Sequence, residues 1–105
     1  MLIVSGDVTA RTDRREDMLR AAVEHVHRSR LEPGCISHDV SVDAENPLRL
    51  MFFERWQDEA ALKAHFAVPA SRAFWKLLQS LAAEPGAMHI YEAREIRHDT
   101  REIRV

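Results

Sequence analysis

Residues 47–66, PLRLMFFERWQDEAALKAHF, decide the fold because they begin with the pattern of a strand and end with that of a helix. Side chains alternate along a strand, so Leu50, Phe52 and Trp56 share one face, and Met51 and Phe53 share the other. A strand with one solvated face would alternate between apolar and polar residues. The two apolar faces therefore predict that this strand is covered twice, once by its own helices and once by another layer.

Glu54 is in phase with Phe52 and Trp56, which places a carboxylate on an apolar face. Such a group needs a partner or a functional role, because burying an unpaired charge is costly. In the following helix, His65 is in phase with Leu62 and is predicted to point inward, toward the same neighbourhood. We therefore expect Glu54 and His65 to be catalytic. The alternative is a buried histidine that is satisfied by a backbone carbonyl.

The composition narrows the class of protein. A chain of 105 residues predicts one domain, and its net charge of −2 comes from interspersed charges with no basic stripe for nucleic acid. No run approaches the roughly 20 apolar residues that span a bilayer. Cys35 has no second cysteine with which to pair, which fits a reducing compartment. The N-terminal apolar run is too short for a signal peptide. We expect a cytoplasmic protein that binds neither nucleic acid nor membrane.

The rest of the chain supplies three further strands and two helical regions. Strands are predicted over residues 2–10, 35–43 and 88–96, a helix from residue 13 to about 30, and a second helical region that Pro69 interrupts. The order β-α-β-β-α-β is typical of the ferredoxin-like α+β fold, with a four-stranded antiparallel sheet. We expect the domain to cover residues 1–96 and a charged tail to cover residues 97–105.

The first helix is predicted to bury one stripe, and its histidines are expected to lie outside it. The stripe consists of Leu19, Ala22, Val23 and Val26. His25 and His27 are two positions apart, so they point to different sides, cannot share a metal, and are expected in solvent.

Two further polar residues stand inside predicted strands. His38 is in line with Ile36, Val40 and Val42, which predicts a satisfied buried histidine more strongly than a catalytic one. Asp7 lies within the first strand, where Asp is disfavoured, which indicates an edge position or a functional one.

The sequence contains no Gly-rich phosphate loop, no H-E-x-x-H motif and no Cys/His cluster with the spacing of metal ligands. We therefore expect no cofactor, neither metal nor flavin.

An ordered set of short motifs resembles a known family. Glu32-x-Gly34-Cys35 precedes a strand, Glu54-Arg55-Trp56 follows, and Leu62-Lys63-Ala64-His65, Pro69 and Ala73-Phe74 complete the set. In this order and spacing they resemble the antibiotic biosynthesis monooxygenase (ABM) domain, most closely its quinol-monooxygenase-like branch, from the first strand to the fourth. The resemblance implies a homodimeric ferredoxin-like α/β-barrel. It also implies oxygenation of electron-rich aromatic or quinol substrates by O2 without metal, flavin or haem.

The chain departs from the family pattern at two places. Quinol-type members often have a histidine directly after the proline, and this chain has Ala70 after Pro69. The haem-degrading branch uses an Asn on the first strand, near the position of Asp7, and Trp75 stands where that branch would have a His. These departures weaken a haem-linked role.

Two functions of different class follow. The first is a cofactor-independent monooxygenase, with His65 as the base and Glu54 as its orienter. Its substrate-binding residues are Trp56, Phe66, Phe74, Trp75, His38 and Asp7. The second is a non-catalytic dimeric small-molecule-binding or stress-response protein, which Ala70 favours. The structural alternative for the aromatic residues is an ordinary core.

Overall fold

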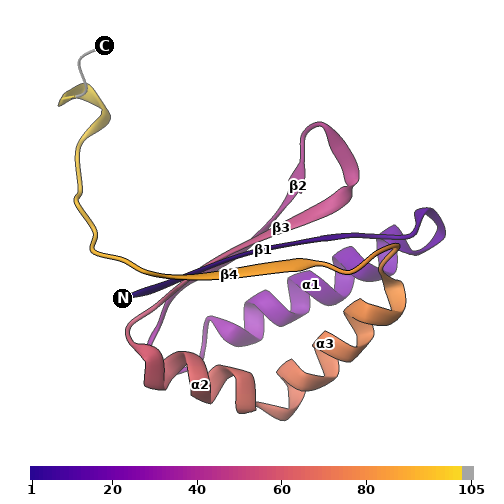
Figure 1. Cartoon of the computed structure of the whole chain (residues 1–105), viewed down its shortest axis with the longest axis horizontal. Coiled ribbons are helices and arrows are strands. Elements are labelled where there is room, and N and C mark those ends of the chain that lie inside the picture. Colours follow the sequence, from indigo (N-terminus) through magenta and orange to yellow (C-terminus); the bar gives the residue numbers. More distant parts are fainter. Residues whose placement is uncertain (103–105) are drawn as a thin grey trace.

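The computed structural model describes residues 1–102, and its topology confirms the predicted ferredoxin-like α+β fold. Four strands form one antiparallel sheet in the order β2-β3-β1-β4. The three α-helices all lie on one side of this sheet (Figure 1). In chain order the elements are β1 (Leu2–Thr9), η1 (Thr12–Arg14), α1 (Arg15–Ser29), β2 (Cys35–Asp43), β3 (Asn46–Trp56), α2 (Glu59–Ala67), α3 (Pro69–Leu81), β4 (Ala87–Glu92) and η2 (Thr100–Glu102).

The central strand β3 has the two faces that its sequence predicts. Its inner face, toward the helices, carries Leu50, Phe52, Glu54 and Trp56, all buried. On its outer face, Phe53 remains 46% exposed. The helices thus cover one face of the sheet, and no second layer covers the other face within the described chain.

Helix α1 buries a different stripe from the one expected. Its buried residues are Met18, Ala22, His25, Val26 and Ser29, whereas Val23 is 37% exposed. The expectation that His25 lies in solvent is therefore wrong, while His27 is exposed as expected. The buried face runs through the polar residues His25 and Ser29, and their polarity hid the true phase of the helix.

A register shift at the start of β2 corrects a second face assignment. Cys35 pairs with Trp56, but Ser37 pairs with the next residue back, Arg55, so that Ile36 is the extra residue of a bulge. Ile36 is 49% exposed and does not share the inner face with His38.

The turn before β2 depends on one glycine. Gly34 has φ +82°, and a Cβ built there would lie 2.5 Å from the Cβ of Ala61 in α2. Its carbonyl accepts a hydrogen bond of 2.8 Å from the backbone N–H of Gln57. Asp58 is the N-cap of helix α2, and its side chain accepts a hydrogen bond of 2.9 Å from the N–H of Ala61. Gly34 thus lets β2 begin close against α2.

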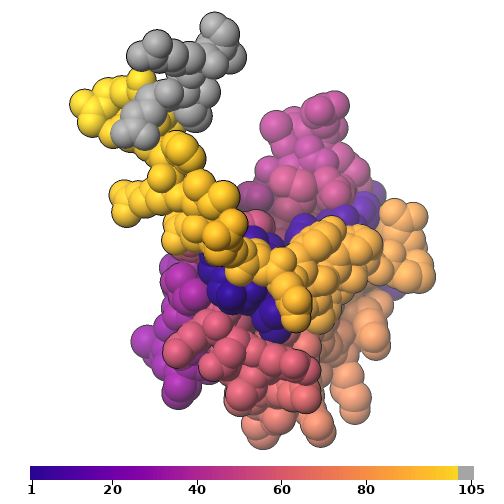
Figure 2. All heavy atoms as spheres, turned by 60° about the vertical axis from the view of Figure 1, so that its left-hand side comes forward, coloured from indigo at the N-terminus to yellow at the C-terminus, as the bar shows by residue number. Residues whose placement is uncertain are grey.

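The fourth strand ends at Glu92, four residues earlier than predicted, and the described residues that follow extend away from the body of the molecule (Figure 2). Near the sheet, Glu95 approaches Arg55 of β3 at 3.8 Å. The predicted tail over residues 97–105 begins in this segment, and its residues 103–105 lie outside the described part. None of the helices within residues 1–102 is long and apolar enough to cross a membrane.

Candidate functional site

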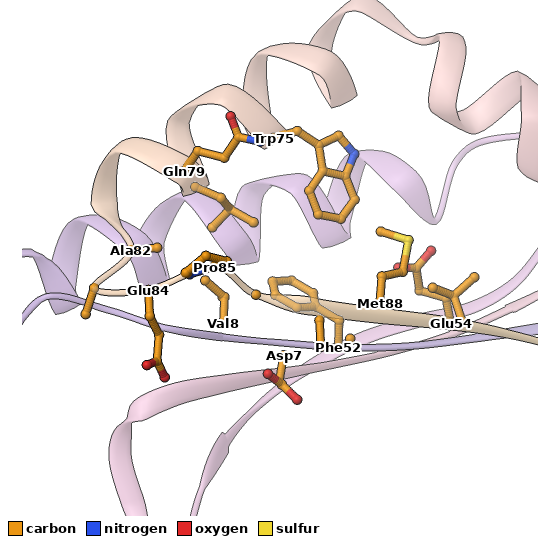
Figure 3. Close-up of a pocket in the computed structure, with 16 residues that line it drawn as sticks. Asp7, Val8, Phe52, Glu54, Trp75, Gln79, Ala82, Glu84, Pro85 and Met88 are labelled. Carbon is orange, nitrogen blue, oxygen red and sulfur yellow. The ribbon is translucent and has the colours of Figure 1, made fainter.

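A cavity of about 600 Å³ lies between the inner face of the sheet and α3 (Figure 3). Trp75 and Gln79 of α3 cover the cavity. Val8, Phe52 and Met88 form its floor on the sheet. Its remaining lining comes mainly from small or apolar residues, namely Val4, Gly6, Leu78, Ala82, Ala83, Pro85, Gly86 and Ala87. A cavity of this size and character suits a small apolar or aromatic molecule.

Glu54 is the buried carboxylate on the wall of this cavity, with 3% of its surface exposed. Its Oε1 accepts a hydrogen bond of 2.9 Å from Trp56 Nε1–H. The same oxygen lies 3.2 Å from His38 Nε2 and 4.0 Å from His65 Nε2. The carboxylate therefore faces the cavity on one side and two imidazoles on the other.

Behind Glu54, three histidines from three elements form a compact group, which we call the histidine cluster. His25 of α1, His38 of β2 and His65 of α2 have ring centroids 5.2–5.5 Å apart. Their exposed fractions are 2%, 0% and 0%. One nitrogen from each ring can be chosen so that all three lie within 4.8 Å of one another. This arrangement offers three ligand atoms to one ion.

His65 has a different carboxylate partner from the expected one. Its Nδ1 lies 2.9 Å from Glu32 Oε1, whereas Glu54 is 4.0 Å from its other nitrogen. A carboxylate can only accept, so Nδ1 donates to Glu32, and Nε2 points into the cluster. Glu32 stood in the motif set that resembles the family, but sequence reasoning gave it no partner, because it lies 33 residues before His65.

Burial in the cluster sets the charge of His25. Burial, and after it the neighbouring His38, His65 and Arg28, together lower the pKa of His25 from 6.5 to about 3. His25 is therefore a neutral imidazole at pH 7. Nearby, burial raises the pKa of the Cys35 thiol, and the negative charges of Glu32 and Glu54 add to that shift.

The predicted aromatic wall divides between the cavity and the cluster. Trp75 lines the cavity, and Phe74 stacks on His25 with ring centroids 4.0 Å apart. Trp56 and Phe66 pack on His65, with centroids at 4.5 Å and 5.8 Å, and do not border the cavity. Only Trp75 of the four therefore lies where a molecule in the cavity can touch it.

Asp7 borders the cavity, but its carboxylate points to the other side of the sheet (Figure 3). There it pairs with Arg49 at 2.8 Å. The residues that sequence reasoning left out of the site are Phe52, Leu78, Gln79 and Met88 around the cavity and His25 and Glu32 around the cluster. Phe52 carried a signal, since its strand pattern placed it on the same face as Glu54 and Trp56.

Comparison with known proteins agrees with this architecture. A family model described as antibiotic biosynthesis monooxygenase matches residues 1–77. The uncharacterized protein sll1783 of Synechocystis is 32% identical over 94 residues, which cover 90% of this chain but only 64% of that protein. YcnE of Bacillus subtilis, provisionally named a monooxygenase, is 29% identical over 62% of this chain and 68% of its own length.

Solved structures resemble the chain over nearly its whole length. A protein of Deinococcus radiodurans, provisionally named an antibiotic biosynthesis monooxygenase, superimposes with a TM-score of 0.89 at 25% identity, over 95% of this chain and 99% of its own. A crystal structure named as an antibiotic biosynthesis monooxygenase gives a TM-score of 0.84 at 27% identity, over 90% of this chain and all of that one.

Proposed function

The chain belongs to the antibiotic biosynthesis monooxygenase family, and from this premise we propose that it oxygenates a small electron-rich aromatic or quinol-like substrate with O2. The observation that carries the proposal is the buried Glu54 carboxylate on the wall of a mainly apolar cavity. The volume of about 600 Å³ suits a substrate with one aromatic ring or a few fused rings. The quinol-monooxygenase-like branch remains the branch that we propose.

The reaction starts with removal of a proton from a substrate hydroxyl or an acidic ring carbon. Glu54 accepts that proton, because it is the buried carboxylate that borders the cavity. The resulting anion gives up an electron to O2, and the apolar lining keeps water from the intermediates. One oxygen atom then enters the substrate. The other leaves as water with two hydrogens that the substrate loses, so no separate reductant enters the balance.

His65 becomes a positioning residue in this proposal and not the base that its sequence suggested. It does not line the cavity, and its Nε2 lies 4.0 Å behind Glu54 Oε1. Trp56, by its hydrogen bond of 2.9 Å, fixes the orientation of the same carboxylate. Trp75 supplies a flat apolar wall on which an aromatic ring can stack.

The test is O2 uptake by the purified chain with a panel of quinols and dihydroxyaromatics. We expect uptake with at least one class, and a loss of roughly 10²-fold or more in Glu54→Gln, the usual scale for a lost general base. Glu92→Gln is the matched control, because Glu92 is an exposed glutamate on β4. Full activity in Glu54→Gln would contradict the assignment of the base.

A second candidate function is binding without catalysis. The observation in its favour is Ala70 after Pro69, where quinol-type members often have a histidine. A compound from the panel that binds in the cavity, shown by quenching of Trp75 fluorescence, but causes no O2 uptake would favour this function. Trp75→Phe identifies the signal, since Trp56 is buried outside the cavity.

We propose, in addition, that two chains pair through the outer faces of their sheets. Phe53 and Tyr91 are 46% and 53% exposed on that face, and Ile3 of β1 pairs with Tyr91 on the same face. Packing two sheets face to face would remove these side chains from water. Sedimentation should give a dimer for the wild type and a monomer for Phe53→Lys. Val23→Lys, on the helical side, should stay dimeric.

A further inference from the structure

Unpaired nitrogen atoms concentrate in the histidine cluster. Within residues 1–102, four buried side-chain nitrogen or oxygen atoms lack a hydrogen-bond partner: His25 Nδ1, His38 Nδ1, His38 Nε2 and His65 Nε2. All four belong to the cluster. His38 Nε2 lies 3.2 Å from Glu54 Oε1 but does not meet hydrogen-bond geometry. A buried polar atom left unpaired destabilises the fold, so a group of four needs an explanation.

The rings converge from separate parts of the chain onto one point. His25 comes from α1, His38 from β2 and His65 from α2, and a nitrogen from each lies within 4.8 Å of the other two. Three aliphatic side chains would fill this core with no unpaired atoms. The convergence of three imidazoles, almost fully removed from water, is typical of a site that holds an ion.

We propose that His25, His38 and His65 together bind one divalent first-row transition metal ion. Imidazole nitrogen is the ligand type that zinc, copper, nickel, cobalt and iron share. Bonds of about 2.0–2.1 Å to one tetrahedral ion place its ligand nitrogens about 3.4 Å apart, so the three nitrogens would draw roughly 1.4 Å closer than a 4.8 Å separation.

A metal site also needs oriented ligands and balanced charge, and the residues around the cluster can supply both. Glu32 accepts the Nδ1–H of His65 at 2.9 Å, which turns the lone pair of Nε2 toward the cluster. Glu54 places Oε1 3.2 Å from His38 and 4.0 Å from His65, where it can complete the coordination. One divalent cation would offset the charges of these two carboxylates.

This inference goes beyond the proposed function and does not depend on it. Glu54 is the residue shared between the cluster and the cavity wall. Sequence reasoning excluded a metal because residues 25, 38 and 65 have no motif spacing. The ligands are distant in the chain and meet only in the folded protein.

The experiment uses the full chain, stripped of metal with a chelator and titrated with Co²⁺, then with Zn²⁺ in competition. We expect one Co²⁺ per chain with visible absorption bands of a low-coordinate site, and displacement of those bands by Zn²⁺. His38→Gln and His65→Gln should lose the bands, while His27→Gln should keep them, because His27 is exposed on the same helix as His25. Glu32→Gln should weaken the affinity by roughly 10–100-fold, as loss of an outer-shell partner does.

Three outcomes would overturn the proposal. They are the absence of a stoichiometric Co²⁺ band in the wild type, equal bands in His38→Gln and wild type, and loss of the bands in His27→Gln. The wild-type titration decides the matter even where a cluster variant fails to fold, which circular dichroism would reveal. The readout is absorption and not O2 uptake, so failure of the metal site and failure of the oxygenase proposal are separate results.

Discussion

The cavity and the histidine cluster lie beneath the same face of the sheet, and they differ in what fills the space between sheet and helices. Around the cavity the chain places small residues, among them Gly6, Ala82 and Gly86, and leaves about 600 Å³ open. In the cluster, three imidazoles fill the space and are almost completely buried. The cavity is open space with few polar groups, whereas the cluster consists of polar groups and, in the described part of the chain, encloses no open cavity.

The difference follows from how closely the backbone segments approach. Gly86 lies so near β1 that a Cβ there would be 2.6 Å from the carbonyl oxygen of Asp7, so the loop before β4 requires a residue without a side chain. At the other end, α1, α2 and β2 each send a ring inward. Glu54 contacts both regions. The proposed chemistry therefore depends on a residue that lies between the open cavity and the packed cluster.

The largest effect on stability is expected from a substitution of Phe74, which lies between the cluster and the cavity. Phe74 stacks on His25 at 4.0 Å and meets Phe52 at a centroid distance of 6.1 Å, so it stands between cluster and cavity. Phe74→Ala should lower the free energy of unfolding by about 3–5 kcal/mol, the usual cost of removing a buried aromatic ring. Urea unfolding measures it. Leu77→Ala, an exposed position on the same helix, should cost less than about 1 kcal/mol. Equal losses in the two variants would refute this division.

A smaller effect sharpens the contrast between open and packed space. Ala82 lines the cavity, whereas Ala22 is fully buried on α1 and does not line it. Ala22→Leu should destabilise the chain by about 1–3 kcal/mol through overpacking, and Ala82→Leu by less than about 1 kcal/mol, because the cavity accepts the added methyl groups. Thermal unfolding of both variants checks this. If Ala82→Leu costs as much as Ala22→Leu, the cavity is not open space in solution.

The smallest expected effect is a change in the reactivity of Cys35, which depends on the charges beside the histidine cluster. Burial, and then the carboxylates of Glu32 and Glu54, raise the pKa of the Cys35 thiol, so little thiolate is present at pH 8. Glu32→Gln removes one of those charges and should speed alkylation of Cys35 by iodoacetamide roughly two- to fivefold. Glu59→Gln, an exposed change on α2, is the control. An unchanged rate in Glu32→Gln would show that Glu32 carries no negative charge beside Cys35.

Much of the fold could be predicted from local patterns. The period of two in β3 identified the inner face with Phe52, Glu54 and Trp56, because neighbouring side chains of a strand must alternate. Pro69 marked the break between α2 and α3, since proline favours the first turn of a helix. The inward direction of His65 followed in the same way from helical phase. Local geometry sufficed for each of these predictions.

Patterns failed where the period was disturbed or interrupted. The buried face of α1 includes His25 and Ser29, so a search for apolar residues selected Val23 instead. The bulge at Ile36 moved that residue to the surface, because one extra residue reverses the faces on one side of it. Neither error changed the topology, but the first concealed a member of the histidine cluster.

The sequence by itself determined the order of the elements, the face that Glu54 and His65 occupy, and the family to which the chain belongs. Only the tertiary structure decided what meets those side chains. His38 stands opposite Glu54 through the register of β2 on β3, Glu32 reaches His65 from a turn 33 residues away, and His25 arrives from α1. Local periodicity fixes the direction in which a side chain points. Which groups converge there depends on how the layers pack, and that is a property of the whole fold.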